Sequence, residues 1–299
     1  MPRRSHYTAA GSRLAQLTEP RRADLHVHTT QSDGEFTALQ VVALAKQANL
    51  AALAITDHDT LAAVELARTA AGDHLELVPG VEITAGFGGR EVHLLGYFIR
   101  TDHAELNAAL ARLCDRRRER FRSYVEQLAG AGFALPEDRV RHLEETTPSL
   151  GRRHVAGLLV AAGFVQHRTE AFHRVLKLVG PQVLPKLLLP VEEAIRLVRD
   201  AGGASSLAHP PTDLTDEDFG TLAGFGLNAL EAEYPWGRKS LTARLRLAAG
   251  RFGFAVTGGS DCHGPVPAHR CVGSHGITSD ELELLRGKCA PRGSGGCQG

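Results

Sequence analysis

The clearest chemical signal in the sequence is a histidine pair, His26 and His28, separated by one valine. In an extended strand, alternate side chains point to the same face, so both imidazoles would lie on one side, about 7 Å apart along the strand. Such a pair can converge on one metal ion. An isolated pair more often consists of two buried histidines that bond to the backbone, so the interpretation depends on the rest of the chain.

Two more groups with ligand chemistry follow apolar runs. Asp33 lies in the turn at 30–34, although an aspartate before a glycine is also common in turns for conformational reasons. Residues 56–59, Thr-Asp-His-Asp, follow a short apolar run and are hard to explain by packing. We interpret His58 as a ligand candidate, with Asp57 and Asp59 as partners that fix its tautomer. Asp59 is equally compatible with a helix N-cap.

The second half of the signal is a set of titratable residues inside or at the ends of predicted strands. Glu82 lies within an apolar strand, where a carboxylate without a cation nearby would be costly to bury. His93 should face the same side as Glu82, and His209 ends another strand. Asp261 and His263 share one face of a further strand end, flanked by glycines that allow close backbone approach.

Together these positions predict a metal centre. Imidazole and carboxylate ligands without thiolates suit Mn²⁺, Zn²⁺ or Fe²⁺ rather than Ca²⁺. We expect two or three divalent ions, with Mn²⁺ preferred and Zn²⁺ or Fe²⁺ as alternatives. The predicted ligands are His26, His28, Asp33, His58, Glu82, His93, His209, Asp261 and His263.

Alternating strand and helix patterns supply the framework for these residues. Strands are predicted at 23–29, 50–56, 75–84, 91–99, 203–208, 228–233 and 254–257, with helices at 37–49, 61–71, 191–201, 216–226 and 239–250. This alternation implies parallel strands with crossover helices. About seven strands would suit a closed or nearly closed barrel, whose chemistry lies at the C-terminal ends of the strands.

The alternation is interrupted between 102 and 186, where the pattern is mostly helical. We therefore predict an α/β fold made of a barrel, 23–101 and 187–288, with a helical insertion at 102–186 that acts as a substrate lid. The segments 1–22 and 289–299 are expected to be disordered.

Composition narrows the class of protein. The 299 residues include 34 Lys+Arg and 34 Asp+Glu, and this balance argues against a dedicated duplex-binding protein. The five cysteines are odd in number and form no C-x-x-C pair, which disfavours a disulfide framework or zinc ribbon. With no apolar signal region and no apolar stretch long enough to span a membrane, a cytoplasmic location is expected.

These same motifs resemble the PHP (polymerase and histidinol phosphatase) family. The resemblance covers 24–29, 56–60, 79–83, 93–97, 208–210 and 259–264, or about 240 residues from first to last motif. It implies a distorted (β/α)7 barrel with a trinuclear site. In that site His26, His28, Glu82 and Asp261 would hold one ion, Glu82, His93 and His209 a second, and Asp33, His58 and His263 a third.

Asp33 at the third site, together with the insertion, is similar to the members that act on nucleoside 3′,5′-bisphosphates or on the 5′ ends of short RNA. The chain departs from those members at Cys262, at 233–235 and at 179–186.

Clustered divalent ions fit phosphoester hydrolysis, because one ion yields hydroxide from water near neutral pH and two ions clamp the phosphate oxygens. We expect His58, Glu82 and His263 to be closest to this chemistry. The expected partner is a small phosphorylated molecule, most simply a nucleotide, or a short single-stranded RNA, with no membrane and no obligate protein partner.

Four residues of the insertion are candidates for binding a second phosphate. A guanidinium matches phosphate in a bidentate way. The alternative is that these residues form a solvated helix face. The candidates are Arg152, Arg153, His154 and Lys186.

Three alternative functions remain at this stage. One is a phosphatase for histidinol phosphate or another small phosphomonoester. Another is a non-catalytic PHP module, which is disfavoured because all nine ligand positions are filled. The third is hydrolysis of a C–N bond, which in similar barrels usually relies on a bridging lysine that these motifs lack.

Overall fold

The computed structural model describes residues 22–289. The two ends expected to be disordered, 1–22 and 289–299, lie outside the described residues apart from Arg22 and Cys289. Arg22 is the first residue of a strand, so the ordered barrel begins one residue earlier than the sequence predicted.

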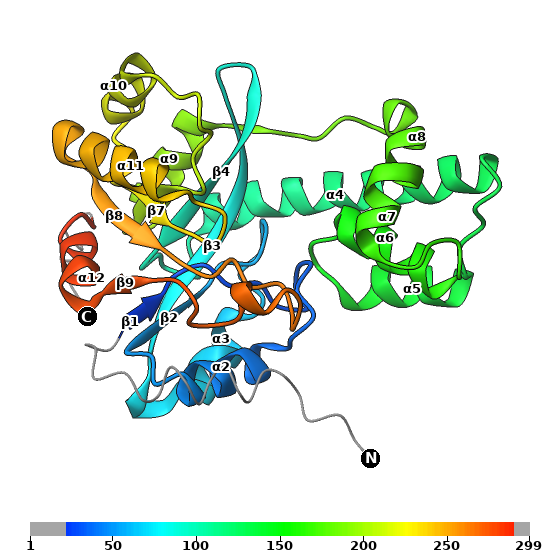
Figure 1. Cartoon of the computed structure of the whole chain (residues 1–299), viewed down its shortest axis with the longest axis horizontal. Helices are drawn as coiled ribbons and strands as arrows, with labels where there is room; N and C mark the ends of the chain where they lie inside the picture. The colour runs from blue at the N-terminus through cyan, green and yellow to red at the C-terminus, as the bar shows by residue number, and fades with distance from the viewer. Residues whose placement is uncertain (1–21, 290–299) are drawn as a thin grey trace, which may run out of the picture.

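The centre of the molecule is one twisted sheet whose order is β8-β7-β6-β4-β3-β2-β1-β9, with β5 paired to β3 (Figure 1). The strands are β1 (Arg22–Asp24), β2 (Ala52–Ile55), β3 (Glu76–Phe87), β4 (Arg90–Tyr97), β5 (Leu189–Pro190), β6 (Ala204–Leu207), β7 (Ala229–Glu233), β8 (Ala255–Gly258) and β9 (Ile277–Thr278).

The sheet curls until its ends approach each other. The backbone N–H of Leu25 donates to the carbonyl of Gly258 at 3.1 Å, and that of His28 donates to Cys262 at 3.0 Å. These bonds join the chain just after β1 to the chain at and after β8, so the sheet is a nearly closed barrel. The predicted α/β barrel class is confirmed.

Two strands run against the predicted parallel arrangement. The short β9 pairs antiparallel with β1. β4 pairs antiparallel with both β3 and β6. The cause is the turn Gly88-Gly89, because a two-residue connection makes a hairpin and leaves no length for a crossover helix. Both glycines have positive φ, as such tight turns require.

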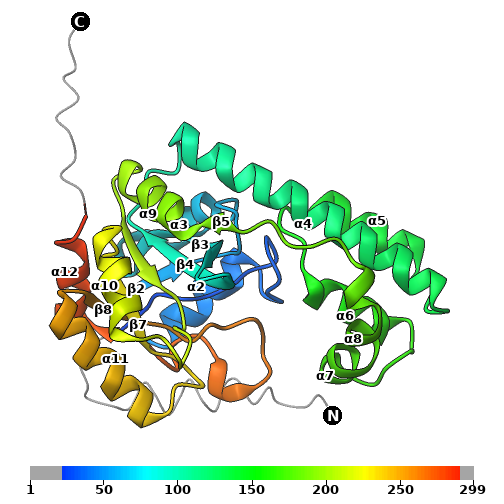
Figure 2. The same cartoon turned by 90° about the horizontal axis from the view of Figure 1, so that it is seen from above.

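Helices cover the outside of the barrel (Figure 2). Thr37 is the N-cap of the first of these helices, because its hydroxyl accepts a hydrogen bond from the backbone N–H of Gln40 at 3.3 Å. The covering helices are α2 (Ala38–Gln47), α3 (Val64–Ala71), α9 (Val191–Asp200), α10 (Asp216–Gly224), α11 (Lys239–Phe252) and α12 (Ser279–Arg286).

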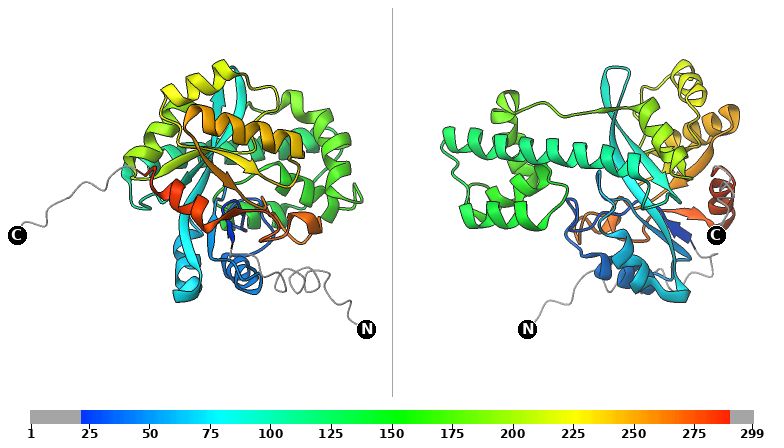
Figure 3. Two further views of the ribbon diagram at one scale, coloured as in Figure 1. Left: turned by 60° about the vertical axis from the view of Figure 1, so that its left-hand side comes forward. Right: turned by 180° about the vertical axis from the view of Figure 1, so that it is seen from behind.

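The segment between β4 and β5 forms a helical body beside the barrel (Figures 1 and 3). Its helices are α4 (Ala104–Gly130), α5 (Glu137–Thr146), α6 (Arg152–Ala161), α7 (Arg168–Glu170), a π-helix (Ala171–Leu176) and α8 (Lys177–Val179).

The long helix α4 belongs to two hydrophobic cores. Leu106 and Leu110 near its start pack into the barrel core, whereas Phe121 and Leu128 pack into the core of the helical body. Burying one face of a single rigid helix in both cores fixes the helical body against the barrel. Within residues 22–289, no helix combines the length and apolar character needed to cross a bilayer.

Candidate metal centre

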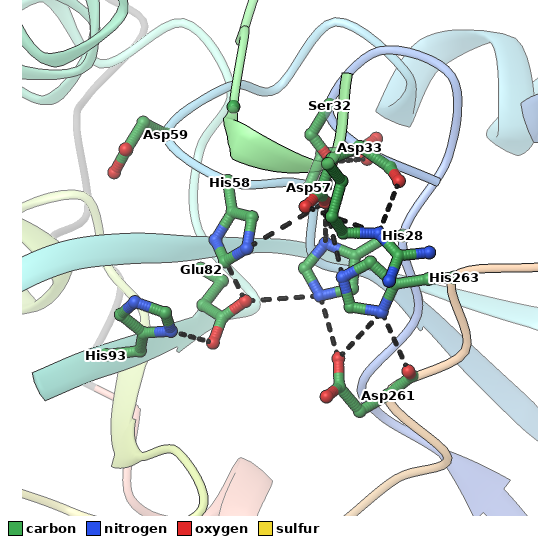
Figure 4. Close-up of polar contacts among 12 residues, drawn as sticks. His28, Ser32, Asp33, Asp57, His58, Asp59, Glu82, His93, Asp261 and His263 are labelled. Carbon is green, nitrogen blue, oxygen red and sulfur yellow. Dashed lines mark hydrogen bonds and ion pairs between the residues drawn. The ribbon is translucent and has the colours of Figure 1, made fainter. Parts of the chain in front are cut away.

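Glu82 lies at the middle of the site and its two carboxylate oxygens face different groups of imidazoles (Figure 4). Oε2 lies 3.2 Å from Nε2 of His26, 3.2 Å from Nε2 of His28 and 3.1 Å from Nδ1 of His58. Oε1 lies 2.8 Å from Nδ1 of His93 and 3.1 Å from Nε2 of His209. A carboxylate arranged in this way is placed to bridge two cations.

His26 and His28 follow β1 in extended chain, and this geometry explains how they reach Glu82. The strand ends at Asp24, but Val27 still pairs with Cys262 across the closing edge of the barrel. The alternation predicted from the sequence therefore persists beyond the strand, and both rings point inward with their centroids 5.2 Å apart.

Asp261 is the second carboxylate of this group. Its Oδ1 lies 3.1 Å from Nε2 of His28 and 3.4 Å from Nε2 of His26. Oδ1 therefore converges on the same space as Oε2 of Glu82. Two carboxylate oxygens and two imidazole nitrogens form a compact four-atom set around one point.

A third group forms around Asp33 at the edge of the cluster. Oδ1 of Asp33 lies 3.2 Å from Nε2 of His263, 3.9 Å from Nε2 of His58 and 4.0 Å from Nδ1 of His28. Nitrogen and oxygen atoms of these four residues all lie within 4.8 Å of one another. All nine residues predicted as ligands from the sequence thus come together in one place.

Buried polar atoms of this cluster lack hydrogen bonds in the described part of the chain. They are Nε2 of His26, Nε2 of His28, Oδ1 of Asp33 and Nδ1 of His58. Each of these atoms has a polar or charged neighbour within about 4 Å, but none makes a hydrogen bond with it. The atoms converge on the same small space instead. Unsatisfied buried polar atoms are costly, and divalent cations bound among them would satisfy these atoms. The donor set therefore fits metal ions.

A buried carboxylate behind the cluster holds two of the candidate ligands in place. Glu231, which is fully buried, contacts Nδ1 of His26 at 2.9 Å and accepts the backbone N–H of His209 at 2.6 Å. Such contacts orient an imidazole so that its other nitrogen faces the metal. The φ angles of His209 and Asp261 are positive, at 27° and 44°, so these two ligands sit in strained backbone that the surroundings must stabilise.

Asp57 and Asp59 act differently from the sequence-based expectation. Asp57 accepts hydrogen bonds from the backbone and hydroxyl of Thr29, at 2.7 and 2.6 Å, and from Ser32. It therefore holds the chain between His28 and Asp33 and does not orient His58.

Asp59 accepts hydrogen bonds from the backbone of Thr84 at 2.6 Å and from Nε of Arg117 at 2.6 Å. The N-cap position of α3 is Ala63, so Asp59 is not a helix cap. It ties β3 to α4 of the helical body.

The charges of the cluster govern its protonation. Burial opposes protonation of His28 and His93, but the facing carboxylates outweigh burial and raise the pKa of each to about 9. Burial lowers the pKa of His58 well below its usual value, so His58 stays neutral as a ligand must. Burial alone would raise the pKa of Glu82, but the surrounding imidazoles hold it well below its usual range.

A cavity of about 320 Å³ opens over this cluster. Its floor includes His58, Glu82 and His263, and its opposite wall is formed by the helical body. Basic side chains line that wall: Arg116, Arg117, Arg120, Arg152, Arg153 and Lys186.

The four insertion residues predicted to bind substrate occupy three different environments. Arg152 is exposed, lies over the ring of Phe172 at 5.8 Å and has no polar partner that the structure describes within 22–289. Lys186 lines the cavity but is paired with Glu91, which lies 3.1 Å from Nε2 of His93.

Arg153 and His154 contact the loop that carries Asp33. Nε of Arg153 donates to the Asp33 carbonyl at 3.2 Å. Nδ1 of His154 accepts the backbone N–H of Gly151 at 2.9 Å, and the ring also bonds to the backbone of Ser32. His154 lines a neighbouring cavity of about 450 Å³ and not the one above the metal cluster.

Sequence reasoning missed Arg270, which also lines the cavity and contacts Asp261. It lies in a proline-rich connection after β8, outside every motif, and only the folded path of that connection brings it to the site.

Comparisons with known proteins agree with this geometry. The family model described as "PHP domain" matches residues 24–148. A 3′,5′-nucleoside bisphosphate phosphatase of Chromobacterium violaceum is 31% identical over 261 residues, which cover 84% of this chain and 90% of that protein. The 5′-3′ exoribonuclease Rnm of Escherichia coli is 34% identical over 190 residues, which cover 62% of this chain and 64% of the relative's length.

Among solved structures, that of a candidate metal-dependent phosphoesterase from Bifidobacterium adolescentis is similar, with a TM-score of 0.83 and 30% identity. The match covers 91% of this chain and 98% of the other.

Proposed function

Since the chain belongs to the PHP domain family, we propose that it is a metal-dependent phosphoesterase that removes a phosphate from a nucleotide, such as a nucleoside 3′,5′-bisphosphate. The 5′ ends of short RNA are a related substrate. The observation that carries this proposal is the Glu82 carboxylate, whose oxygens divide five imidazoles into two groups beneath a basic cavity.

The ligand groups suggest how ions would be shared. His26, His28 and Asp261 with Oε2 of Glu82 would hold one ion, and His93 and His209 with Oε1 a second. Asp33, His58 and His263 would hold a third. Mn²⁺ is the proposed metal, with Zn²⁺ or Fe²⁺ as the alternatives.

When bound, such ions act as Lewis acids that make water nucleophilic at neutral pH and offset the charge of a phosphate. The protein's own part is to hold that phosphate against the cluster. His58 and His263 are 12% and 11% exposed and face the cavity, whereas Glu82 is 1% exposed beneath them. A phosphate would thus meet the Asp33 group first.

The helical body supplies the second half of the cavity, and we assign residues 102–186 the role of a substrate lid over the barrel of 23–101 and 187–288. Arg152 is the side chain best placed to bind a second phosphate, because it is exposed at the cavity and carries no ion pair among residues 22–289. Lys186 would contribute charge, although Glu91 offsets part of it. Contacts away from the reacting phosphate mainly position the substrate.

The test is a phosphatase screen on protein whose metal content has been measured. The proposal predicts that a nucleoside 3′,5′-bisphosphate is turned over with higher kcat/KM than histidinol phosphate or another small phosphomonoester. A preference for histidinol phosphate would replace the nucleotide assignment with the phosphomonoester one. Absence of turnover in metal-loaded protein on every phosphoester would favour a non-catalytic PHP module.

A further inference from the structure

Among residues 22–289, Arg270 is the one arginine or lysine of this cavity that reaches the metal cluster from the barrel side. It ends the short 3-10 helix Ala268–Arg270, within the connection between β8 and β9. Its side chain is 23% exposed, and it lines the same cavity as His58 and Glu82. The other basic residues of that cavity come from the helical body or the connection that follows it, so Arg270 faces them across the space where a substrate would lie.

Arg270 contacts only one of the two carboxylate oxygens of Asp261. Nη2 of Arg270 lies 2.6 Å from Oδ2 of Asp261 and 2.7 Å from the carbonyl oxygen of the same residue. Oδ1 is left to face the imidazoles of His26 and His28. The guanidinium thus fixes the carboxylate so that one chosen oxygen points into the cluster.

The second contact, to the Asp261 carbonyl, bears on backbone strain. Asp261 has a φ of 44°, in the left-handed region that non-glycine residues seldom adopt. A conformation of this kind persists only where the surroundings hold it. A bond from a fixed guanidinium to that carbonyl supplies part of the restraint.

Trp236 holds the guanidinium itself. The Arg270 guanidinium carbon lies 4.5 Å from the centre of the Trp236 ring, within the range of a cation–π contact. The same ring lies 5.6 Å from His209 and 5.5 Å from Tyr234. Trp236 therefore lies between Arg270, which contacts Asp261, and the candidate ligand His209. The residue is 48% exposed.

The contacts with Asp261 use only the Nη2 end of the Arg270 guanidinium. Its Nε is buried and has no hydrogen-bond partner that the structure describes within 22–289. A guanidinium has five N–H donors in a planar fork that matches the oxygens of a phosphate. Nη2 is occupied by Asp261, whereas the guanidinium that carries Nε belongs to a side chain lining the cavity over the cluster.

We propose that Arg270 has two functions: it positions Asp261 through Nη2 and binds an oxygen of the substrate phosphate through its remaining N–H groups, with Trp236 holding the guanidinium in place. This inference rests on the phosphoesterase assignment but not on the identity of the nucleotide. A purely structural ion pair would explain the Asp261 contacts, but would leave the buried Nε without a role.

The experiment compares Arg270→Met and Arg270→Lys with the wild-type chain, using Mn²⁺ alone and inorganic phosphate as probes. Isothermal titration of metal-free protein gives the Mn²⁺ dissociation constant, and equilibrium dialysis of radiolabelled phosphate at saturating Mn²⁺ gives phosphate affinity. Arg251→Met is the matched control, because Arg251 also pairs with an aspartate, Asp216, and lies 5.4 Å over an aromatic ring, but on the outer surface.

For Arg270→Met we expect Mn²⁺ binding to weaken at least fivefold and phosphate binding by metal-saturated protein to weaken at least tenfold. Arg270→Lys should keep part of the phosphate affinity. Added guanidinium chloride, at concentrations that leave the thermal midpoint unchanged, should restore part of the kcat/KM lost in Arg270→Met. If Arg270→Met does not fold, Trp236→Leu takes its place. We expect Trp236→Leu to weaken both Mn²⁺ binding and phosphate binding, by smaller factors.

Phosphate affinity of metal-saturated Arg270→Met within twofold of wild type would overturn the phosphate contact. An unchanged Mn²⁺ dissociation constant would overturn the positioning of Asp261. If the metal-loaded wild-type protein binds no phosphate and hydrolyses no phosphoester, the phosphoesterase proposal itself fails, and the comparison of variants is not reached.

Discussion

Replacing Glu82 with glutamine tests whether one carboxylate serves two ions. Glutamine keeps the size of the side chain and one carbonyl oxygen, but places an amide against the other group of imidazoles. Oε2 has three imidazole nitrogens within 3.2 Å and Oε1 has two within 3.1 Å, so either amide orientation removes an anionic ligand from one group. The loss of one negative charge also weakens binding of the ion that remains.

We expect Glu82→Gln to lower kcat/KM at least a hundredfold. This factor corresponds to about 2.7 kcal/mol of transition-state stabilisation, since each tenfold change is about 1.36 kcal/mol. Bound metal, measured by inductively coupled plasma mass spectrometry after dialysis, should fall by at least one ion per chain. Metal loss and rate loss should occur together.

The matched control is Glu76→Gln at the start of the same strand. Glu76 pairs with Arg286 at 2.6 Å and its side chain is 41% exposed, so it lies at the surface and outside the metal cluster. We expect kcat/KM within twofold of wild type in this variant. Near-wild-type turnover with full metal content in Glu82→Gln would refute the bridging role.

Four further outcomes are expected. Arg152→Ala and Lys186→Ala should lower kcat/KM toward a nucleoside bisphosphate about tenfold more than toward a simple phosphomonoester, and equal losses on both substrates would contradict a second-phosphate role. His154→Ala should reduce metal content rather than raise KM, because its ring holds the loop of Asp33, and a pure KM effect would argue against this. Removing metal with a chelator should lower the free energy of unfolding by about 4 kcal/mol, relative to protein at a thousandfold excess of metal over Kd. An unchanged midpoint of chemical denaturation would oppose this. Metal binding at pH 7 should release protons and strengthen as pH rises toward about 9, because the two imidazoles whose pKa is about 9 must lose protons to bind. Titration in buffers of different ionisation enthalpy detects this release, and a heat independent of buffer would exclude it.

The gathering of the nine ligand candidates could be predicted because each lies on or next to an element with a strong apolar pattern. Glu82 illustrates the reason: a carboxylate within an apolar strand has few explanations other than a cation nearby. Alternation of side chains then gave the facing direction of His26 and His28, even though the strand that carries them ends at Asp24.

Other features depend on tertiary geometry that leaves little trace in local sequence. The reversal of β4 follows from a two-residue turn. The predicted strands at 75–84 and 91–99 already left too few residues for a crossover helix, so the expectation of parallel strands was wrong at this point. Asp57 and Asp59 hold neighbouring chain segments rather than His58, because their partners, Thr29 and Thr84, come from other parts of the barrel. Arg270 was missed because no motif marks the connection that carries it.

The central claim is that divalent ions lie on both sides of the Glu82 carboxylate, and anomalous diffraction from crystals grown with Mn²⁺ tests it most directly. We predict two peaks about 3.5–4 Å apart that share Glu82. One should be ligated by His26, His28 and Asp261, the other by His93 and His209. The account would be contradicted if no anomalous peak lay beside the Glu82 carboxylate, or if a single ion were bound and His93 and His209 were not among its ligands.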